Sequence, residues 1–336
     1  MDLLTQGLLG TALAQGGARR EEVRRAAGIG FLAGMLADAD ALIRSNTDPL
    51  LVLEYHRHFT HSVFFIPFGA LIAALLLWPF VRRRLNFPRL YWFCLLGYSL
   101  SGVLDAFTSY GTYLFWPVSQ DRISWHMISI LDPVFSSMLL IGGVLAFKYR
   151  CSVFAKVGLV LCAGYLAVAG LQLTRAEAAI AELIRDRDHL ASKILVKPTL
   201  GNIILWRSIY EYRGVAYVDV VRVGLKFEPR VFEVGSIKLL DVSRDFPGLA
   251  VDSTLFRDIN RFDAFSDGYI ALHPTNPRII GDVRYANSPG DIKPLWGIEF
   301  DLAKPGEHVA YRFYRDLGEQ NRRSFLNMLF NSQDVD

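Results

Sequence analysis

The sequence predicts an α-helical membrane domain of about six membrane-embedded helices, followed by a small, mainly β extramembrane domain. The chain of 336 residues is 52% hydrophobic, with a mean hydropathy of +0.26, which is too apolar for an ordinary soluble domain. Nearly all of its long apolar runs fall within residues 1–173, whereas the remainder carries mixed charge, Pro, Gly and short alternating stretches. We therefore expect a membrane domain over 1–173, an amphipathic connecting helix over 174–196 and the β domain over 197–336.

The membrane helices are predicted from the roughly 20 residues that an α-helix needs to cross a bilayer. Four apolar runs are long enough, namely 62–81, 90–108, 127–147 and 153–173. The third of them contains Asp132-Pro133. Residues 3–15 and 26–37 form two shorter runs, the second rich in Gly and Ala, which suit tight helix packing or a partial crossing.

Clusters of Lys and Arg set the orientation of these helices. Three connecting loops are basic, and the positive-inside rule places them in the cytoplasm. Their basic residues are Arg19, Arg20, Arg24 and Arg25, then Arg82, Arg83, Arg84 and Arg89, then Lys148, Arg150 and Lys156. Six crossings place both termini, and with them the β domain, outside the inner membrane, which is the periplasm of a Gram-negative cell.

Beyond residue 173 the pattern changes twice. Apolar residues near helical spacing over 174–194 predict the amphipathic helix that carries the chain out of the membrane. After Lys197-Pro198, alternating apolar stretches, some of them separated by turn residues, predict strands. These strands cover residues 215–225, 231–234, 237–242, 269–272 and 298–302.

Charge, cysteine content and motifs argue against several classes of protein. A net charge of +3 is too small to indicate a nucleic-acid partner. Cys94, Cys151 and Cys162 lie within or beside apolar runs, so no disulfide framework is expected. The chain starts without a basic segment, so we expect no cleaved signal peptide. The patterns GxSxG, HExxH, CxxC and the P-loop do not occur, which leaves the corresponding hydrolase, redox and nucleotide-binding functions without motif support.

Residues 55–62 are the most informative segment, because they hold three of the seven histidines of the chain. His56, His58 and His61 lie at the outer end of the run at 62–81. Imidazole is the commonest protein ligand for borderline transition metals, so the cluster predicts a metal site at a membrane surface. The alternative is a His-rich helix edge that reaches toward water. Arg57 suits an anion clamp for a phosphate or carboxylate group, or else a contact with a lipid headgroup.

Aspartates supply further candidate ligands. Asp38 and Asp40 follow the run at 26–37, where a helix end or turn would let both carboxylates reach one cation; the alternative is a simple polar helix terminus. Asp105 lies near the outer end of its apolar run. An ionised carboxylate is costly in lipid, which favours metal or catalytic use over a helix-end contact with water or Arg.

The predicted topology brings these candidates to one face of the membrane. Gln6 begins the first helix on the outer side, where the His cluster and the three aspartates also lie. Asp132 either supports a metal site without binding the metal itself, or satisfies the backbone groups that Pro133 frees. That all these candidates lie on the same side of the membrane is the strongest internal argument for one shared site.

At these residues the chain resembles the bacterial inner-membrane metal-dependent hydrolases of the YdjM type. The matching stretches are residues 1–6, 36–40, 56–62, 104–112 and 130–133. An Asn-x-x-x-Trp-Arg signature at 202–207 and the pattern Gly-Asp-Val-Arg-Tyr at 281–285 extend the resemblance over most of the chain. The family is related to zinc-dependent phospholipase C and the zinc nucleases of that fold, so the resemblance implies an all-α metal site that activates water against a phosphoester.

The resemblance also implies which residues form the site. The implied metal ligands are Asp38, Asp40, His56, His61 and Asp105, with Gln6, His58 and Asp132 as additional candidates. We expect Asp105, Asp40 and Arg57 to serve catalysis. Members usually have His where this chain has Gln6, although a subgroup has Gln, and usually have His at Ser101. The loss of an imidazole would remove one metal, change the choice of metal or abolish catalysis, unless His58 compensates.

Two functions follow from these observations. The first is a membrane-bound hydrolase that acts on a phosphoester or lipid-linked substrate at the outer face of the inner membrane, with a divalent ion, zinc or alternatively manganese. The second is a catalytically degenerate membrane protein that binds a lipid or a protein through its β domain. A transporter is a weaker alternative, because the polar residues gather at one face and not near mid-membrane. Membrane lipids are expected partners in either case.

Overall fold

The structure is a computed structural model that describes residues 1–224, 228–314 and 318–330. Its contacts divide the chain into two compact units. The first contains Met1–Ile43, Tyr55–Leu171 and Leu200–Asn202, and the second contains Arg44–Glu54, Gln172–Thr199 and the described residues from Ile203 onward. The first unit is helical, and the second is built on two β-sheets.

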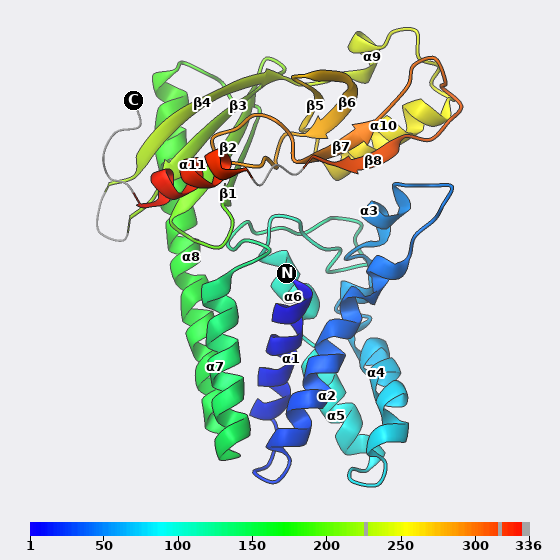
Figure 1. The fold of residues 1–336 in the computed structure, drawn as a ribbon, viewed down its shortest axis with the longest axis vertical. Helices are drawn as coiled ribbons and strands as arrows, with labels where there is room; N and C mark the ends of the chain where they lie inside the picture. The colour runs from blue at the N-terminus through cyan, green and yellow to red at the C-terminus, as the bar shows by residue number, and fades with distance from the viewer. Residues whose placement is uncertain (225–227, 315–317, 331–336) are drawn as a thin grey trace. The chain divides into compact units, whose positions relative to one another are not determined.

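The long helices of the first unit lie with their axes roughly aligned, successive helices running in opposite directions, and form a bundle (Figure 1). The elements in the N-terminal half of the chain are α1 (Leu3–Gly16), α2 (Val23–Leu36), the 3₁₀ helix η1 (Ala37–Leu42), α3 (Leu51–Tyr55), the 3₁₀ helix η2 (Phe59–His61), α4 (Ile66–Val81), α5 (Phe87–Tyr98), α6 (Ser101–Ala106), α7 (Pro133–Tyr149) and α8 (Ser152–Asp186).

Glycines let several of these helices approach closely. Gly10 of α1, Gly30 of α2 and Gly97 of α5 meet at their backbones, so a Cβ atom on Gly97 would lie 2.8 Å from the carbonyl oxygen of Gly30. Helices α7 and α8 approach in the same way, because a Cβ atom on Gly142 would lie 3.1 Å from the Cα atom of Gly158. Such contacts between small residues are typical of helices that pack within a membrane.

The three basic turns, which follow α1, α4 and α7, gather at one end of this bundle (Figure 1). The Nη1 group of Arg25 donates a hydrogen bond to the backbone oxygen of Arg84 at 3.3 Å. The Nε group of Arg24 donates one to the backbone oxygen of Phe147 at 3.0 Å. The positive-inside interpretation requires this arrangement, in which all three basic turns lie on one side.

Helix length supports only part of the predicted set of about six spans. Among the described residues, α8 alone is long and apolar enough to cross a membrane, and Leu51–His61 together with α4 would form a second span with a bend of 92°. Helices α1 and α2 have 14 residues each and α5 has 12, short of the roughly 20 that a crossing needs. Large apolar side chains are nevertheless exposed on α4 and α8, among them Leu76, Phe80, Val160 and Leu171. An exposed apolar surface of this kind is expected to face lipid.

The run predicted as a helix at 127–147 becomes helical only at Pro133, and two further predicted helix boundaries are wrong. The run at 90–108 is not one helix, because α5 ends at Tyr98 and α6 begins at Ser101. Between them the Ser99 hydroxyl donates to the carbonyl oxygen of Leu96, a local bond that competes with the helical backbone. The connecting helix predicted over 174–196 is not separate either, because α8 continues unbroken to Asp186. The residues of α8 change from apolar to charged along its length, but its helical backbone continues through that change.

The second unit contains two four-stranded antiparallel sheets in which each strand pairs with the next along the chain. The first sheet is β1 (Lys193–Pro198), β2 (Leu205–Tyr212), β3 (Val215–Arg222) and β4 (Arg230–Lys238), and the second is β5 (Ile270–His273), β6 (Asn276–Asp282), β7 (Trp296–Glu299) and β8 (Ala310–Phe313). Leu195 of β1 lies opposite Ile209 of β2, and both pack in one core with Tyr269, Ala271 and Val283. The apolar faces of the two sheets therefore share a core.

The mainly β character of this unit agrees with the prediction, but the individual elements agree less well. The strand predicted at 231–234 and the first two residues of the one predicted at 237–242 belong to a single strand, β4, and Leu225 of the strand predicted at 215–225 lies outside the described residues. The sequence interpretation misses β1, β2, β6 and β8. It also misses three helices, α9 (Val242–Asp245), α10 (Thr254–Phe265) and α11 (Glu319–Phe330).

Candidate metal centre

Four of the candidate ligands lie on three short elements of the first unit. The 3₁₀ helix η1 continues α2 and carries Asp38 and Asp40, while η2 precedes α4 and carries His61. The six-residue helix α6 follows the break after α5 and carries Asp105. The side chains of the site are thus presented by helix ends and not by the middle of long helices.

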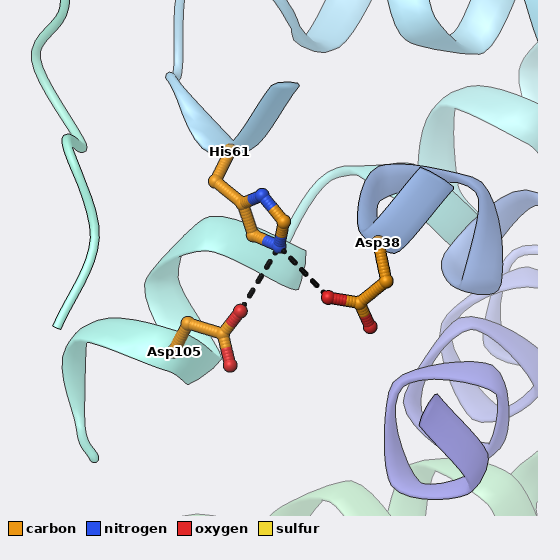
Figure 2. A group of neighbouring side chains, drawn as sticks. All are labelled: Asp38, His61 and Asp105. Carbon is orange, nitrogen blue, oxygen red and sulfur yellow. Dashed lines mark ion pairs between the residues drawn. The ribbon is translucent and has the colours of Figure 1, made fainter. Parts of the chain in front are cut away.

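Asp38, His61 and Asp105 point toward one another (Figure 2). The Nε2 atom of His61 lies 3.3 Å from Oδ1 of Asp38 and 3.0 Å from Oδ2 of Asp105. The side chains of His61 and Asp105 are fully buried, and that of Asp38 is 10% exposed. Within the part of the chain that the structure describes, none of these three atoms has a hydrogen bond of acceptable geometry. A buried polar atom without a partner costs about 1–3 kcal/mol, and a cation between these atoms would satisfy all three.

This donor set fits a divalent metal ion. Carboxylate oxygen and imidazole nitrogen are established ligands of zinc and of related first-row metals. Ligand bonds of about 2.1 Å at tetrahedral angles separate the ligand atoms by roughly 3.4 Å. The two separations measured around His61, 3.0 and 3.3 Å, are close to that value, and all three ligand atoms lie within 4.8 Å of one another.

Asp40 contacts the other ring nitrogen of His61, Nδ1, which is not the one that faces Asp38 and Asp105. Its Oδ2 atom is 3.2 Å from Nδ1 of His61 and accepts hydrogen bonds from the backbone N–H of Arg57 at 2.8 Å and from the hydroxyl of Thr60 at 2.6 Å. Burial alone would raise the pKa of Asp40, but hydrogen bonds with His56 and His61 outweigh it and hold this pKa well below its usual range. An ionised carboxylate at the outer nitrogen fixes the tautomer and orientation of a metal-binding histidine. We therefore interpret Asp40 as a positioning residue for His61.

A second group overlaps the first. One ligand atom from each of Asp38, Asp40 and His56 lies within 4.8 Å of the others. The Nδ1 atom of His56 is 3.0 Å from Oδ1 of Asp40, and its imidazole packs edge-on against the ring of Tyr110. Because Asp38 belongs to both groups, it occupies the position that a carboxylate shared by two metal ions would take.

Arg57 supports Asp105 from within the protein. Its guanidinium group is buried and donates from Nη1 to the hydroxyl of Thr108 and from Nη2 to the backbone oxygen of Met1, both at 3.1 Å. Its Nε atom lies 3.4 Å from Oδ2 of Asp105, and the α-amino group of Met1 donates to Oδ1 of the same carboxylate. These contacts fix the direction of Asp105. The use of Arg57 as a substrate clamp stays a prediction.

Gln6 and Ser101 contact each other at the two positions where the resemblance expects histidine. Gln6 is fully buried on α1, and its Nε2 group donates to the backbone oxygen of Ser101 at 3.2 Å. The Oε1 atom of Gln6 has no hydrogen-bond partner among the described residues. The Ser101 hydroxyl donates to the backbone oxygen of Gly34. The two departures from the family pattern therefore meet at one place, the start of α6, which is the helix that carries Asp105.

The remaining candidates have other surroundings, and neither belongs to the two ligand groups formed by the described residues. The ring of His58 lies among aromatic side chains, 4.7 Å from Tyr113 and 5.6 Å from Trp116 between ring centroids. Asp132 caps α7, because its Oδ1 atom accepts hydrogen bonds from the backbone N–H groups of the first turn. Its Oδ2 atom accepts one from the hydroxyl of Tyr165 at 2.8 Å.

Two residues of the site escape the sequence interpretation. The Thr60 hydroxyl connects Asp40 with His61, since its Oγ1 atom also lies 3.0 Å from Nδ1 of His61. Gly102 of α6 packs on the backbone of His61, where any Cβ atom would overlap the carbonyl oxygen. Gly102 precedes Asp105 by three residues and so lies on the same side of α6. That spacing is the sequence signal by which Gly102 could have been found.

The replacement Asp40→Asn tests the positioning role. It keeps the volume of the side chain but removes the charge that orients His61, so we expect metal affinity to fall about 10–100-fold. Titration of the detergent-solubilised protein with zinc against a competing chelator measures this change. Asp121→Asn, an exposed carboxylate whose partner is Ser119, is the matched control. Unchanged affinity in Asp40→Asn would show that Asp40 does not position His61.

The fold and the site together define a protein with a helical bundle that exposes large apolar side chains and that holds a buried cluster of carboxylates and histidine. The model of the family described as YdjM inner membrane protein matches residues 1–176, so the chain belongs to this family. It is also similar to the uncharacterized protein YfhP of Bacillus subtilis (strain 168), at 28% identity over 178 residues, which cover 51% of this chain and 52% of the relative. The chain thus matches about half of that relative's length. No solved structure matches the chain.

Proposed function

We propose that this chain is a metal-dependent hydrolase of the inner membrane that acts on a phosphoester or lipid-linked phosphate. The observation that carries the proposal is the convergence of Asp38 Oδ1, His61 Nε2 and Asp105 Oδ2, three buried ligand atoms that lack hydrogen bonds among the described residues. A divalent ion held there, zinc or manganese, would act as a Lewis acid and make a bound water more acidic.

The residues around the ligands suit a preorganised site. Asp40 and Thr60 hold the outer nitrogen of His61. The α-amino group of Met1 donates to Oδ1 of Asp105, and Arg57 Nε lies 3.4 Å from Oδ2, which keeps no hydrogen bond among the described residues. Ligands fixed in this way bind with less loss of conformational freedom, and a buried site strengthens each electrostatic contact.

The position of the site supports a substrate taken from the membrane surface. The three basic turns of the first unit lie together at one end of the bundle, and the positive-inside rule assigns that end to the cytoplasm. The site lies on the opposite ends of these helices, after α2, before α4 and after α5. We infer that it faces the outer side and that the second unit, which follows α8, is periplasmic.

Hydrolysis of a substrate panel tests the proposal. We expect the full chain, purified in mild detergent and loaded with zinc or manganese, to release product from aryl phosphodiesters or phospholipids. The activity should be lost in His61→Ala and retained in His58→Ala. If the loaded protein releases nothing while a family member with histidine at both departing positions is active on the same panel, this chain is not a hydrolase.

A second candidate function is metal-dependent binding without turnover. The paired departures at Gln6 and Ser101 favour it, because they replace two imidazoles at one place beside the ligands. This function predicts that the protein binds metal with the same ligands but releases no product from any substrate of the panel.

A further inference from the structure

Two buried cations lie directly opposite each other on neighbouring strands of the second unit. Lys197 of β1 pairs with Arg207 of β2 in the antiparallel register, so their side chains project from the same face of the sheet. That face packs on the second sheet, because Leu195 and Ile209, two residues away from each cation, belong to the shared core. Lys197 is 7% exposed and Arg207 is 3% exposed. Like charges in this arrangement repel each other and lose most of their hydration.

No carboxylate among the described residues forms an ion pair with either cation. Asp282 is within electrostatic range of both, but its oxygens are occupied by Arg284, which donates to them from its backbone N–H, Nε and Nη2 groups. Asp291 is near Arg207, but it is partly exposed and its Oδ1 atom accepts from the backbone N–H of Lys293. Within the described part of the chain, the pair therefore lacks a dedicated counter-ion.

The donors of this pair are only partly used. Arg207 donates from Nη1 and Nη2 to the backbone oxygens of Pro289, Asp291 and Val283, which leaves its buried Nε group without a partner among the described residues. The Lys197 ammonium lies 3.2 Å from the centroid of the Tyr285 ring and forms no side-chain hydrogen bond or ion pair with the described residues. Burial lowers the pKa of Lys197 well below its usual value and that of Arg207 to about 10.

We propose that Lys197 and Arg207 form a binding site for a phosphate-type oxyanion between the two sheets of the second unit. A phosphate group carries nearly two negative charges at neutral pH and accepts several hydrogen bonds, so it matches two cations with unused donors better than a single carboxylate does. The buried hydroxyl of Ser288, next to Pro289, has no partner among the described residues and is a further donor on this segment. The site does not depend on the metal centre or on the proposed hydrolase activity.

A purely structural role for Lys197 predicts the opposite behaviour. If the ammonium served only as a cation–π partner of Tyr285, its removal would destabilise the protein in every buffer. If the cations await an anion, removal of one charge relieves repulsion when no anion is present. The replacement Lys197→Met keeps most of the length of the side chain and removes the charge, so the two roles differ in the sign of the effect.

Thermal unfolding and calorimetry of the full chain in detergent, with inorganic phosphate as the probe, decide between them. We expect the Tm of the unchanged protein to rise with phosphate concentration at constant ionic strength, and calorimetry to detect phosphate binding. Lys197→Met should lose both responses and should melt about 2–4 °C higher than the unchanged protein in phosphate-free buffer. Lys193→Met, an exposed lysine on the same strand that lies over the ring of Tyr269, should keep both responses.

Three outcomes would overturn the proposal. The first is the absence of phosphate binding to the unchanged protein, which can be measured even if the variant does not fold. The second is a Lys197→Met protein that is less stable without phosphate and still responds to it. The third is a response to acetate that exceeds the response to phosphate at equal ionic strength, which would assign the site to a carboxylate.

Discussion

Replacement of His61 by alanine is expected to abolish metal binding by this protein, and Asp105→Ala is expected to do the same. Each variant removes one of three ligand atoms that face a common point, with His61 Nε2 within 3.3 Å of the two carboxylate oxygens. Loss of an outer partner of a ligand already costs about 10–100-fold in affinity, so loss of a direct ligand should cost more. Near-stoichiometric zinc or manganese in the unchanged protein should fall to background in both variants.

Metal analysis by mass spectrometry on protein purified in mild detergent without chelator measures this directly. His58→Ala is the matched control, because it removes an imidazole from the same segment but from an aromatic surrounding. It should keep its metal. If His61→Ala and Asp105→Ala retained the metal of the unchanged protein, or if the unchanged protein bound no more than the variants, the shared site would have to be abandoned.

The central residues of this site could be predicted from the sequence, but the separate roles of the three aspartates could not. Residue type, together with the side of the membrane assigned by the basic loops, was enough to place Asp38, His61 and Asp105 on one face, within a larger set that also held Asp40, His56, His58 and Gln6. Which nitrogen of His61 faces which carboxylate depends on the rotation of a single ring. The structure alone therefore separates Asp38 and Asp105 from Asp40, which the sequence interpretation treats as a ligand of equal rank.

The fold shows a similar limit. A continuous apolar run predicts a continuous helix, so the break at residues 99–100 is invisible until the local hydrogen bond of Ser99 is seen. The opposite error arises in α8, where a change in polarity suggests a boundary although neither Gly nor Pro lies between residues 171 and 186. Helix α10 carried a usable signal, with Ser253 as its cap and Leu255, Ile259 and Phe262 at helical spacing.

The strands β1 and β2 were harder to predict for a physical reason. Residues on both faces of these strands are buried, and one of the two faces carries Lys197 and Arg207 in addition to apolar residues, so the alternation of apolar and polar residues is lost. Strand prediction assumes that buried positions are apolar. The same two residues that conceal the strands are those that we assign to the oxyanion site, which is where local rules are expected to fail.

Gly102→Ala is the second replacement for which we expect a large effect, although it removes no ligand. The added methyl group would overlap the backbone oxygen of His61, and backbone cannot move aside as a flexible side chain can. Overpacking of this kind typically costs about 1–3 kcal/mol. Either α6 with Asp105 or η2 with His61 must move, and a displacement of either separates two of the three ligand atoms. We therefore expect both a lower Tm and the loss of most bound metal.

Gly28→Ala is the control that isolates the contact. Gly28 lies in the interior of α2, and a Cβ atom there would meet nothing within 4 Å, so this variant should keep its metal and gain up to about 1 kcal/mol from helix propensity. Metal content and thermal unfolding measured on the two variants side by side separate a general effect of alanine from a local one. Full metal content in Gly102→Ala would mean that the close approach of α6 to His61 does not determine the site. Loss of metal in Gly102→Ala alone would show that the metal centre depends on backbone packing as well as on its ligands.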